Sequence, residues 1–361
     1  MSKHRFSVAA LISARQSVVV ILMVLALFVT FLSSLAISSV WVPFSHVVTI
    51  LAGGEVEPIA ESAVILDVRL PRSITALLAG AALGIAGLQM QTLFRNPLAD
   101  PFVLGIASGA SLGVAVVLLT SGAAVSSVFA STLGIAGDAV VAAAAIAGAA
   151  IVIVAVLALS NRVESPTTVL IVGLMFGYAA QALVTVLVAG TDPDKLQRWV
   201  AWGFGSFSGV TWLKMSVFAP LILVALGVSV ATTKQLNALL LGESYAASMG
   251  LNVRRMRIVT AALASVLGGV VTAFCGPIAF LGIAVPHMCR GLLGTSDHRA
   301  LVPATILLGG VVALGAQVVS LLPAFLPGNS GVFPLNAVTS LIGAPVVVFV
   351  LMRSRRGGSA V

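Results

Sequence analysis

The sequence predicts an all-α membrane protein with about ten transmembrane helices in a single domain. Of its 361 residues, 59% are hydrophobic and only 8% are charged, and the mean hydropathy is +1.15. Soluble domains carry about 25% charged residues, so this composition excludes a soluble fold. At roughly 20 residues for each crossing, residues 1–361 form one transmembrane domain with no room for a soluble one.

The apolar runs are continuous, which predicts helices rather than β-strands. A membrane strand alternates apolar and polar residues over about ten positions. The first run follows a basic segment and is too long for the core of a signal peptide, so we expect a retained helix. The predicted spans are Ser17–Val40, Ser73–Phe94, Pro101–Thr120, Asp138–Leu159, Thr167–Ala189, Trp212–Thr232, Ile258–Cys275, Ile278–Arg290, Leu301–Leu322 and Leu335–Met352.

Basic residues gather on one side of the predicted membrane. Ten spans place both termini on the same side, and the loops of that side hold 14 of the 19 Lys and Arg residues. The positive-inside rule therefore predicts cytoplasmic termini. The opposite ends of the helices carry all four tryptophans, as an interfacial belt would: Trp41, Trp199, Trp202 and Trp212.

Two short polar segments, Arg69–Arg72 and Arg95–Pro101, border the second span. A charge isolated at bilayer depth is expensive, so the two segments lie at opposite membrane faces. The span between them contains Gly80, Gly84 and Gly87, which predicts close packing against protein rather than lipid.

A third segment, Gly276–Arg290, has a proline near each end and predicts a broken helix. Whether this short span crosses the membrane fully is left open. It contains His287, which we expect to be a hydrogen-bonded structural residue rather than a metal or haem ligand. Cys275 and Cys289 are expected to be small buried residues rather than a disulfide or a metal pair. Within Gly276–Arg290, residues Ala279–Ala284 are similar in sequence to Phe102–Ala107. The two spans that begin there run in opposite directions through the predicted membrane, which is a weak indication of an inverted repeat.

The segments Arg69–Arg72, Arg95–Ala110 and Gly276–Arg290 resemble the permease subunits of FecCD-type ABC importers (type II importers) for iron siderophores, haem and vitamin B12. The resemblance implies a translocating subunit in a bacterial or archaeal plasma (inner) membrane. It also implies a second permease subunit, two ATPase subunits and a substrate-binding protein, soluble or lipid-anchored. A ferric siderophore is the expected cargo, with haem and cobalamin left open, as is the choice between homodimer and heterodimer.

The chain itself is expected to be neither an enzyme nor a cofactor carrier. No G-x-x-x-x-G-K-[ST] phosphate-binding motif occurs in it, so ATP and Mg²⁺ belong on the partner ATPase. It has no paired-carboxylate, H-E-x-x-H or G-x-S-x-G motif, and we assign no catalytic and no metal-binding residue. A secondary, ion-coupled transporter is the alternative, but such carriers usually need an ionisable residue or an unwound ion site at mid-membrane. No ionisable residue is predicted at that depth.

The resemblance assigns three sets of residues, each with a plainer alternative. Arg69 and Arg72 would dock the binding protein, or else anchor the chain at the interface. Segment 233–257 would contact the ATPase, or else be an ordinary amphipathic surface helix. The gate residues could equally be helix caps, Ser165 before Pro166 in particular. The coupling residues are Leu241, Gly242, Glu243, Ala246, Met249 and Gly250, and the cytoplasmic gate residues are Asn96, Leu98, Ser165 and Thr167.

Overall fold

The computed structural model describes residues 2–38, 40–120, 136–160, 166–325 and 331–357. Within these ranges the chain is helical and contains no β-strand, so the predicted all-α fold is confirmed. A helix lies at each of the ten predicted spans. These helices are α1 (Ser2–Ala36), α4 (Leu70–Phe94), α5 (Ile106–Thr120), α7 (Ala136–Ser160), α8 (Pro166–Ala189), α10 (Trp212–Ala231), α13 (Val253–Cys275), α14 (Leu281–Leu293), α15 (His298–Leu321) and α16 (Leu335–Gly357).

The long helices differ in length. Six of the described helical stretches are long and apolar enough to cross a membrane, and four apolar helices are shorter. The 13 residues of α14 extend about 20 Å, less than the hydrocarbon thickness of about 30 Å. The sequence left open whether the eighth span crosses fully, and the length of α14 indicates that this helix alone does not.

Short helices connect the long ones. Gly242 (φ 118°) separates α11 from α12, and Gly294 (φ 64°) follows α14. The connecting elements are α2 (Phe44–Leu51), α3 (Ala60–Ala63), the π-helix η1 (Val64–Arg69), the 3₁₀-helices η2 (Pro101–Leu104) and η3 (Leu322–Phe325), α9 (Pro193–Gly203), α11 (Thr233–Leu240) and α12 (Glu243–Ser248).

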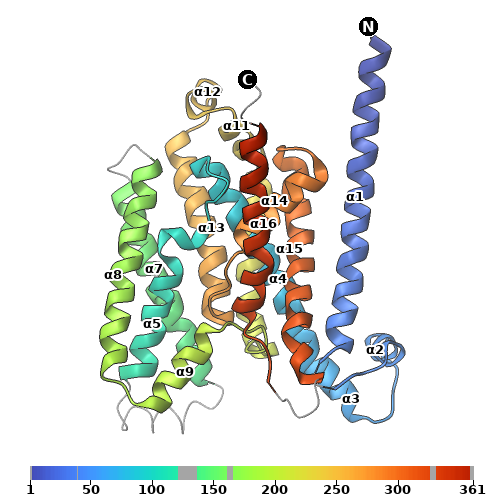
Figure 1. Ribbon diagram of the computed structural model, residues 1–361, viewed down its shortest axis with the longest axis vertical. Helices are drawn as coiled ribbons and strands as arrows, with labels where there is room; N and C mark the ends of the chain where they lie inside the picture. The colour runs from blue at the N-terminus through green and yellow to red at the C-terminus, as the bar shows by residue number, and fades with distance from the viewer. Residues whose placement is uncertain (1, 39, 121–135, 161–165, 326–330, 358–361) are drawn as a thin grey trace.

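The bundle has two distinct ends (Figure 1). At one end lie the start of α1, the end of α16 and the helices α11 and α12; we call it the terminal end. At the other lie α2, α3 and α9, and we call it the α9 end. The four tryptophans belong to α9, to the start of α10 and to the segment between α1 and α2, so they gather at the α9 end as expected.

Helix α4 is the centre of the bundle. Its span is 89% buried, against 17% for α1 and 28% for α8. It packs against α13, α14 and α15, and its glycines allow this contact. A Cβ at Gly80 would overlap the carbonyl oxygen of Gly309, and a Cβ at Gly87 would overlap that of Gly282. The predicted close packing of this span against protein is therefore confirmed.

A second group of helices, α5, α7 and α8, packs in the same way. A Cβ at Gly109 of α5 would lie 2.6 Å from the carbonyl oxygen of Gly148 on α7. The turn η2 sits against α8, where a Cβ at Gly173 would lie 2.8 Å from the Cα of Leu104. Close approach of backbones is the usual basis of helix association in membranes, where burial of apolar surface adds little.

The two similar hexapeptides open helices that run in opposite directions. Helix α5 runs from the middle of the bundle to the α9 end, whereas α14 runs toward the terminal end (Figure 1). Each helix follows a left-handed residue, Gly105 (φ 79°) or Phe280 (φ 68°). The antiparallel directions agree with an inverted repeat, which itself stays a prediction.

The packing of Gly87 predicts a specific loss of stability. In Gly87→Ala the new methyl group must push α14 away, and overpacking of this kind costs about 1–3 kcal/mol. The thermal unfolding midpoint of the purified protein in detergent should therefore fall. Gly227→Ala on α10 is the matched control, because a Cβ there meets nothing within 4 Å. It should be neutral or raise the midpoint. An unchanged midpoint for Gly87→Ala would contradict the described contact between α4 and α14.

Candidate functional sites

The segment between α10 and α13 forms a small structure of its own at the terminal end. Ala246 of α12 is fully buried against Leu236 and Leu239 of α11 and Met256 of α13. Gly250 (φ 85°) ends α12, where the N–H of Leu251 donates to the carbonyl of Ala246 at 3.0 Å. The short helix with a glycine stop was predicted from the sequence. Helix α11 was not, although its apolar residues follow a helical spacing.

Four large apolar side chains of this segment are exposed, and three of them are more than half exposed. Leu241, Tyr245 and Met249 are 65%, 54% and 51% exposed, and they follow one another at intervals of four residues. Tyr245 and Met249 lie four positions apart on α12 and its C-cap, and so on the same side of that helix, whereas Leu241 is the C-cap of α11. We call these three residues the apolar tip. Leu241 and Met249 were among the predicted coupling residues, whereas Tyr245 was missed, although its spacing from Met249 could have revealed it.

Glu243 has a partner inside the chain. Its two carboxylate oxygens accept hydrogen bonds from Nη2 of Arg257 at 2.9 and 3.0 Å. This ion pair holds α12 against the start of α13. The predicted coupling residues thus divide into two kinds. Ala246, Gly242, Gly250 and Glu243 shape the segment, and Leu241 and Met249 face outward.

A chain of hydrogen bonds connects the segment to the bundle. The side-chain oxygen of Asn237 on α11 accepts from the backbone N–H of His298 at 2.8 Å and from its Nδ1 at 2.9 Å. In a neutral ring Nε2 is then an acceptor, and Thr92 of α4 lies 2.8 Å from it. Asn237 also donates to Asp297 at 2.6 Å. The backbone N–H of Arg299 and the Asn237 amide hold the pKa of Asp297 below its ordinary value. The contact between Asn237 and His298 could not be predicted from the sequence, because the two residues lie 61 positions apart.

The turn after α4 contains two of the predicted gate residues. The side chain of Asn96 accepts from the N–H of Leu98 at 2.9 Å, so Asn96 closes its own turn. Nε2 of His287 donates to the carbonyl of Pro97 at 2.7 Å, which confirms a hydrogen-bonded histidine. The described residues contain no group of three metal-ligating side chains.

A buried carboxyl group starts the next element. Asp100 is only 7% exposed, and its Oδ1 accepts from the N–H of Phe102 at 2.8 Å at the start of η2. Burial raises the pKa of Asp100 to about 6. No role for Asp100 was predicted from the sequence.

The other two predicted gate residues are Ser165 and Thr167. Ser165 lies outside the described residues, and Thr167 lies in the first turn of α8. The contact that joins η2 to α8 lies further along this helix, around Gly173. Cys275 and Cys289 are both buried and free, as expected.

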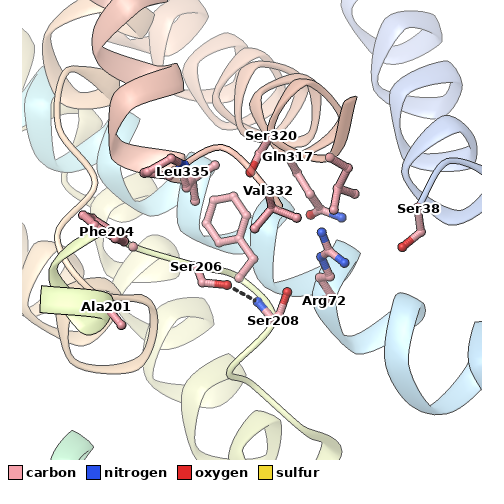
Figure 2. A pocket seen from close by; sticks show the side chains of 14 residues that line it. Ser38, Arg72, Ala201, Phe204, Ser206, Ser208, Gln317, Ser320, Val332 and Leu335 are labelled. Carbon is pink, nitrogen blue, oxygen red and sulfur yellow. Dashed lines mark hydrogen bonds between the residues drawn. The ribbon is translucent and has the colours of Figure 1, made fainter. Parts of the chain in front are cut away.

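The two predicted docking arginines lie in different surroundings at the α9 end. Arg69 is 3% exposed, and its terminal nitrogens donate to the carbonyls of Leu35, Ala36 and Val40, at 2.7, 3.0 and 2.6 Å. It therefore caps the end of α1, and docking through its guanidinium would require these bonds to break. Arg72 is partly buried and lines a pocket at the α9 end (Figure 2).

Comparisons with known proteins agree on the family of this chain. The vitamin B12 import system permease protein of Klebsiella pneumoniae subsp. pneumoniae is 34% identical over 335 residues, 92% of this chain and 93% of that protein. The protein of the same name from Escherichia coli O9:H4 is 35% identical over 291 residues, 80% and 84% of the two chains.

A solved structure has the same fold. The structure titled "An inward-facing conformation of a putative metal-chelate type ABC transporter" matches with a TM-score of 0.77 and 26% identity, over 92% of this chain and 97% of that one. The model of the FecCD transport family matches residues 25–353. This chain belongs to the FecCD transport family.

Proposed function

We propose that this chain is the translocating subunit of a binding-protein-dependent ABC importer for a bulky metal chelate. The observation that carries the proposal is the family match, which spans residues 25–353. The vitamin B12 importer subunits among its relatives and the metal-chelate title of the similar structure support this class of cargo. Ferric siderophores, haem and cobalamin all belong to it. The ferric siderophore expected from the sequence remains one candidate among the three.

The energy source would be a separate ATPase. The chain has no phosphate-binding loop, and the apolar tip offers three exposed apolar side chains at one end of the bundle. An exposed apolar cluster on a small, well-packed support is a typical contact for a partner protein. Two such ATPase subunits would carry ATP and Mg²⁺, and the terminal end would then be cytoplasmic, in agreement with the distribution of basic residues.

A second permease subunit would complete the pathway. Along α8, alternate turns expose large apolar side chains such as Ile171, Tyr178 and Val186, at 50%, 63% and 72%. Either lipid or another permease subunit can cover this face of α8. Because importers of this family contain two permease subunits, we expect the second subunit to cover part of the face and lipid the rest. The α9 end would receive the binding protein on the outer face of the plasma membrane.

Charging the apolar tip should weaken the permease–ATPase complex. Tyr245→Glu or Met249→Glu would place an unpaired charge in an apolar contact, and we expect a loss of about tenfold or more in affinity for the ATPase subunit. ATP-driven uptake should fall with it. Ser244→Glu is the matched control, because it adds the same charge at an exposed polar position of the same helix. Normal assembly of both tip variants, or labelling of the tip from outside the cell, would contradict the proposed contact.

Arg72 and Arg69 should respond differently to substitution. We expect Arg72→Glu to lower the affinity for the binding protein in a salt-dependent way, because repulsion replaces attraction. Arg72→Ala should cost only a few-fold, since exposed charge pairs contribute about 0–1 kcal/mol, and Arg72→Lys should retain docking. Arg69→Ala should instead lower the thermal unfolding midpoint, because three carbonyls at the end of α1 lose their donor. Equal docking by Arg72→Glu and the parent at low salt would contradict a docking role for Arg72.

Uptake should depend on ATP and not on an ion gradient. No ionisable residue is predicted near mid-membrane in this sequence, whereas ion-coupled carriers usually need one at that depth. In proteoliposomes that contain the permease, its ATPase and its binding protein, uptake should require ATP on the ATPase side and persist with ionophores. Uptake driven by an imposed proton or sodium gradient without nucleotide would favour the secondary-transporter class.

A further inference from the structure

The pocket at the α9 end contains a buried amide with no partner. It has a volume of about 400 Å³ and lies where the ends of α4 and α15 meet the segments after α9 and before α16 (Figure 2). Gln317 of α15 lines it and is only 3% exposed. Neither the oxygen nor the nitrogen of its amide forms a hydrogen bond in the described part of the chain. A buried polar group costs free energy unless it is paired, so two such atoms in one side chain require an explanation.

Arg72 faces the same space. Its Nε is also buried and without a partner in the structure. Figure 2 shows the guanidinium of Arg72 and the amide of Gln317 pointing toward one another from α4 and α15. Nearby polar groups are already used, since Ser320 donates to the carbonyl of Phe333 at 2.5 Å and Ser206 accepts from the N–H of Ser208 at 3.1 Å. Among the lining residues, the fully buried side-chain atoms without a partner in the described structure are Arg72 Nε and the two amide atoms of Gln317.

The rest of the lining is largely apolar. Phe204 and Phe207 come from the segment after α9. Val332 lies in the segment before α16, and Leu335 is the first residue of that helix. A concave, mainly apolar wall with a few convergent polar groups is typical of a small-molecule site, and the volume lies within the usual range of roughly 300–1,000 Å³.

The hydrogen-bonding atoms restrict the chemistry of the ligand. Arg72 Nε and Gln317 Nε2 are donors, whereas Gln317 Oε1 is an acceptor. A carboxylate would satisfy both donors but would leave Oε1 unpaired. A carbonyl group that carries a neighbouring N–H, as in an amide, can satisfy all three atoms. A hydroxamate that holds iron cannot, because it has lost its proton and both of its oxygens bind the metal.

We propose that this pocket is an entry subsite that binds an amide group of the transported chelate, with Arg72 and Gln317 as its hydrogen-bonding partners. The inference rests on the proposed function, because it assumes that a chelate enters from the α9 end. It differs from docking of the binding protein, which needs surface contact with Arg72 but no recessed amide.

The test uses the complete transporter, reconstituted in proteoliposomes with its ATPase and binding protein. Three probes are supplied separately: ferrichrome, which carries hydroxamates and amides, cyanocobalamin, which carries amides, and haem, which carries carboxylates only. We expect uptake of ferrichrome or cyanocobalamin. Gln317→Leu should slow that uptake by about tenfold, as loss of a paired amide implies, and leave the affinity for the binding protein unchanged.

The leucine variant should fold at least as well as the parent, because it removes two unpaired buried atoms. The matched control is Gln89→Leu on α4, which also removes a buried amide, one that donates to Ser229 at 2.9 Å, far from this pocket in the described structure. It should keep normal uptake. Restoration of part of the uptake by Gln317→Asn would support a hydrogen-bonding role.

Each contrary result has a distinct meaning. Normal uptake by Gln317→Leu, or uptake of haem alone, would overturn the inference while leaving the importer function intact. A parallel loss of binding-protein affinity in Gln317→Leu would assign the pocket to the binding protein and would also overturn it. Failure of the parent to take up any of the three probes with ATP would contradict the proposed function itself, and the inference with it.

Discussion

The structure depends on direct backbone contact between α4 and its neighbours. At Gly80 and Gly87 there is no room for a Cβ, because carbonyl oxygens of Gly309 and Gly282 occupy the space. In a membrane, lipid is as apolar as the side chains, so helices gain stability from close packing rather than from burial of apolar surface. The glycines of α4 therefore fix the positions of α14 and α15. The pocket at the α9 end lies on α4 and α15, and the coupling segment at the terminal end contacts the same two helices through α11.

At the terminal end, the coupling segment is joined to the same helices through polar contacts. Asn237 contacts Asp297 and His298 at the start of α15, and His298 contacts Thr92 of α4. Arg95, which ends α4, donates to the carbonyl of Leu239 on α11 at 3.3 Å. A displacement of α11 would therefore act directly on α4 and α15. A displacement of α12 would act on α13, to which the ion pair between Glu243 and Arg257 joins it. At the opposite end, α4 contributes Arg72 and α15 contributes Gln317 to one pocket.

Features that depend on local sequence were predictable. The ten helices follow from continuous apolar runs, and the burial of α4 follows from its glycines. The end of α12 follows from Gly250, and the hydrogen-bonded role of His287 from its place in a proline-broken helix. Features that depend on distant residues were not predictable. Arg69 and Arg72 lie three positions apart and look equivalent in sequence. Arg69 is buried because the end of α1 lies beside it and offers its carbonyl oxygens. Arg72 lines a pocket because residues 331–335 fold beside α15. Gln317 is likewise an unremarkable polar residue in an apolar run until these segments surround it.

The continuity of α4 limits how the molecule can move. Its 25 residues extend about 37 Å without a break, and no proline lies inside it after the first turn. Sharp bends in helices need a proline, a π-bulge or an inserted group, and rotation about the axis would drive its Cα atoms into the backbones of α14 and α15. We therefore expect α4 to move as a rigid helix that keeps its contacts with the neighbouring helices along its whole length. The smallest unit that can tilt is then α4 together with the helices packed against it, α13, α14 and α15. A tilt of such a group displaces its two ends in opposite senses.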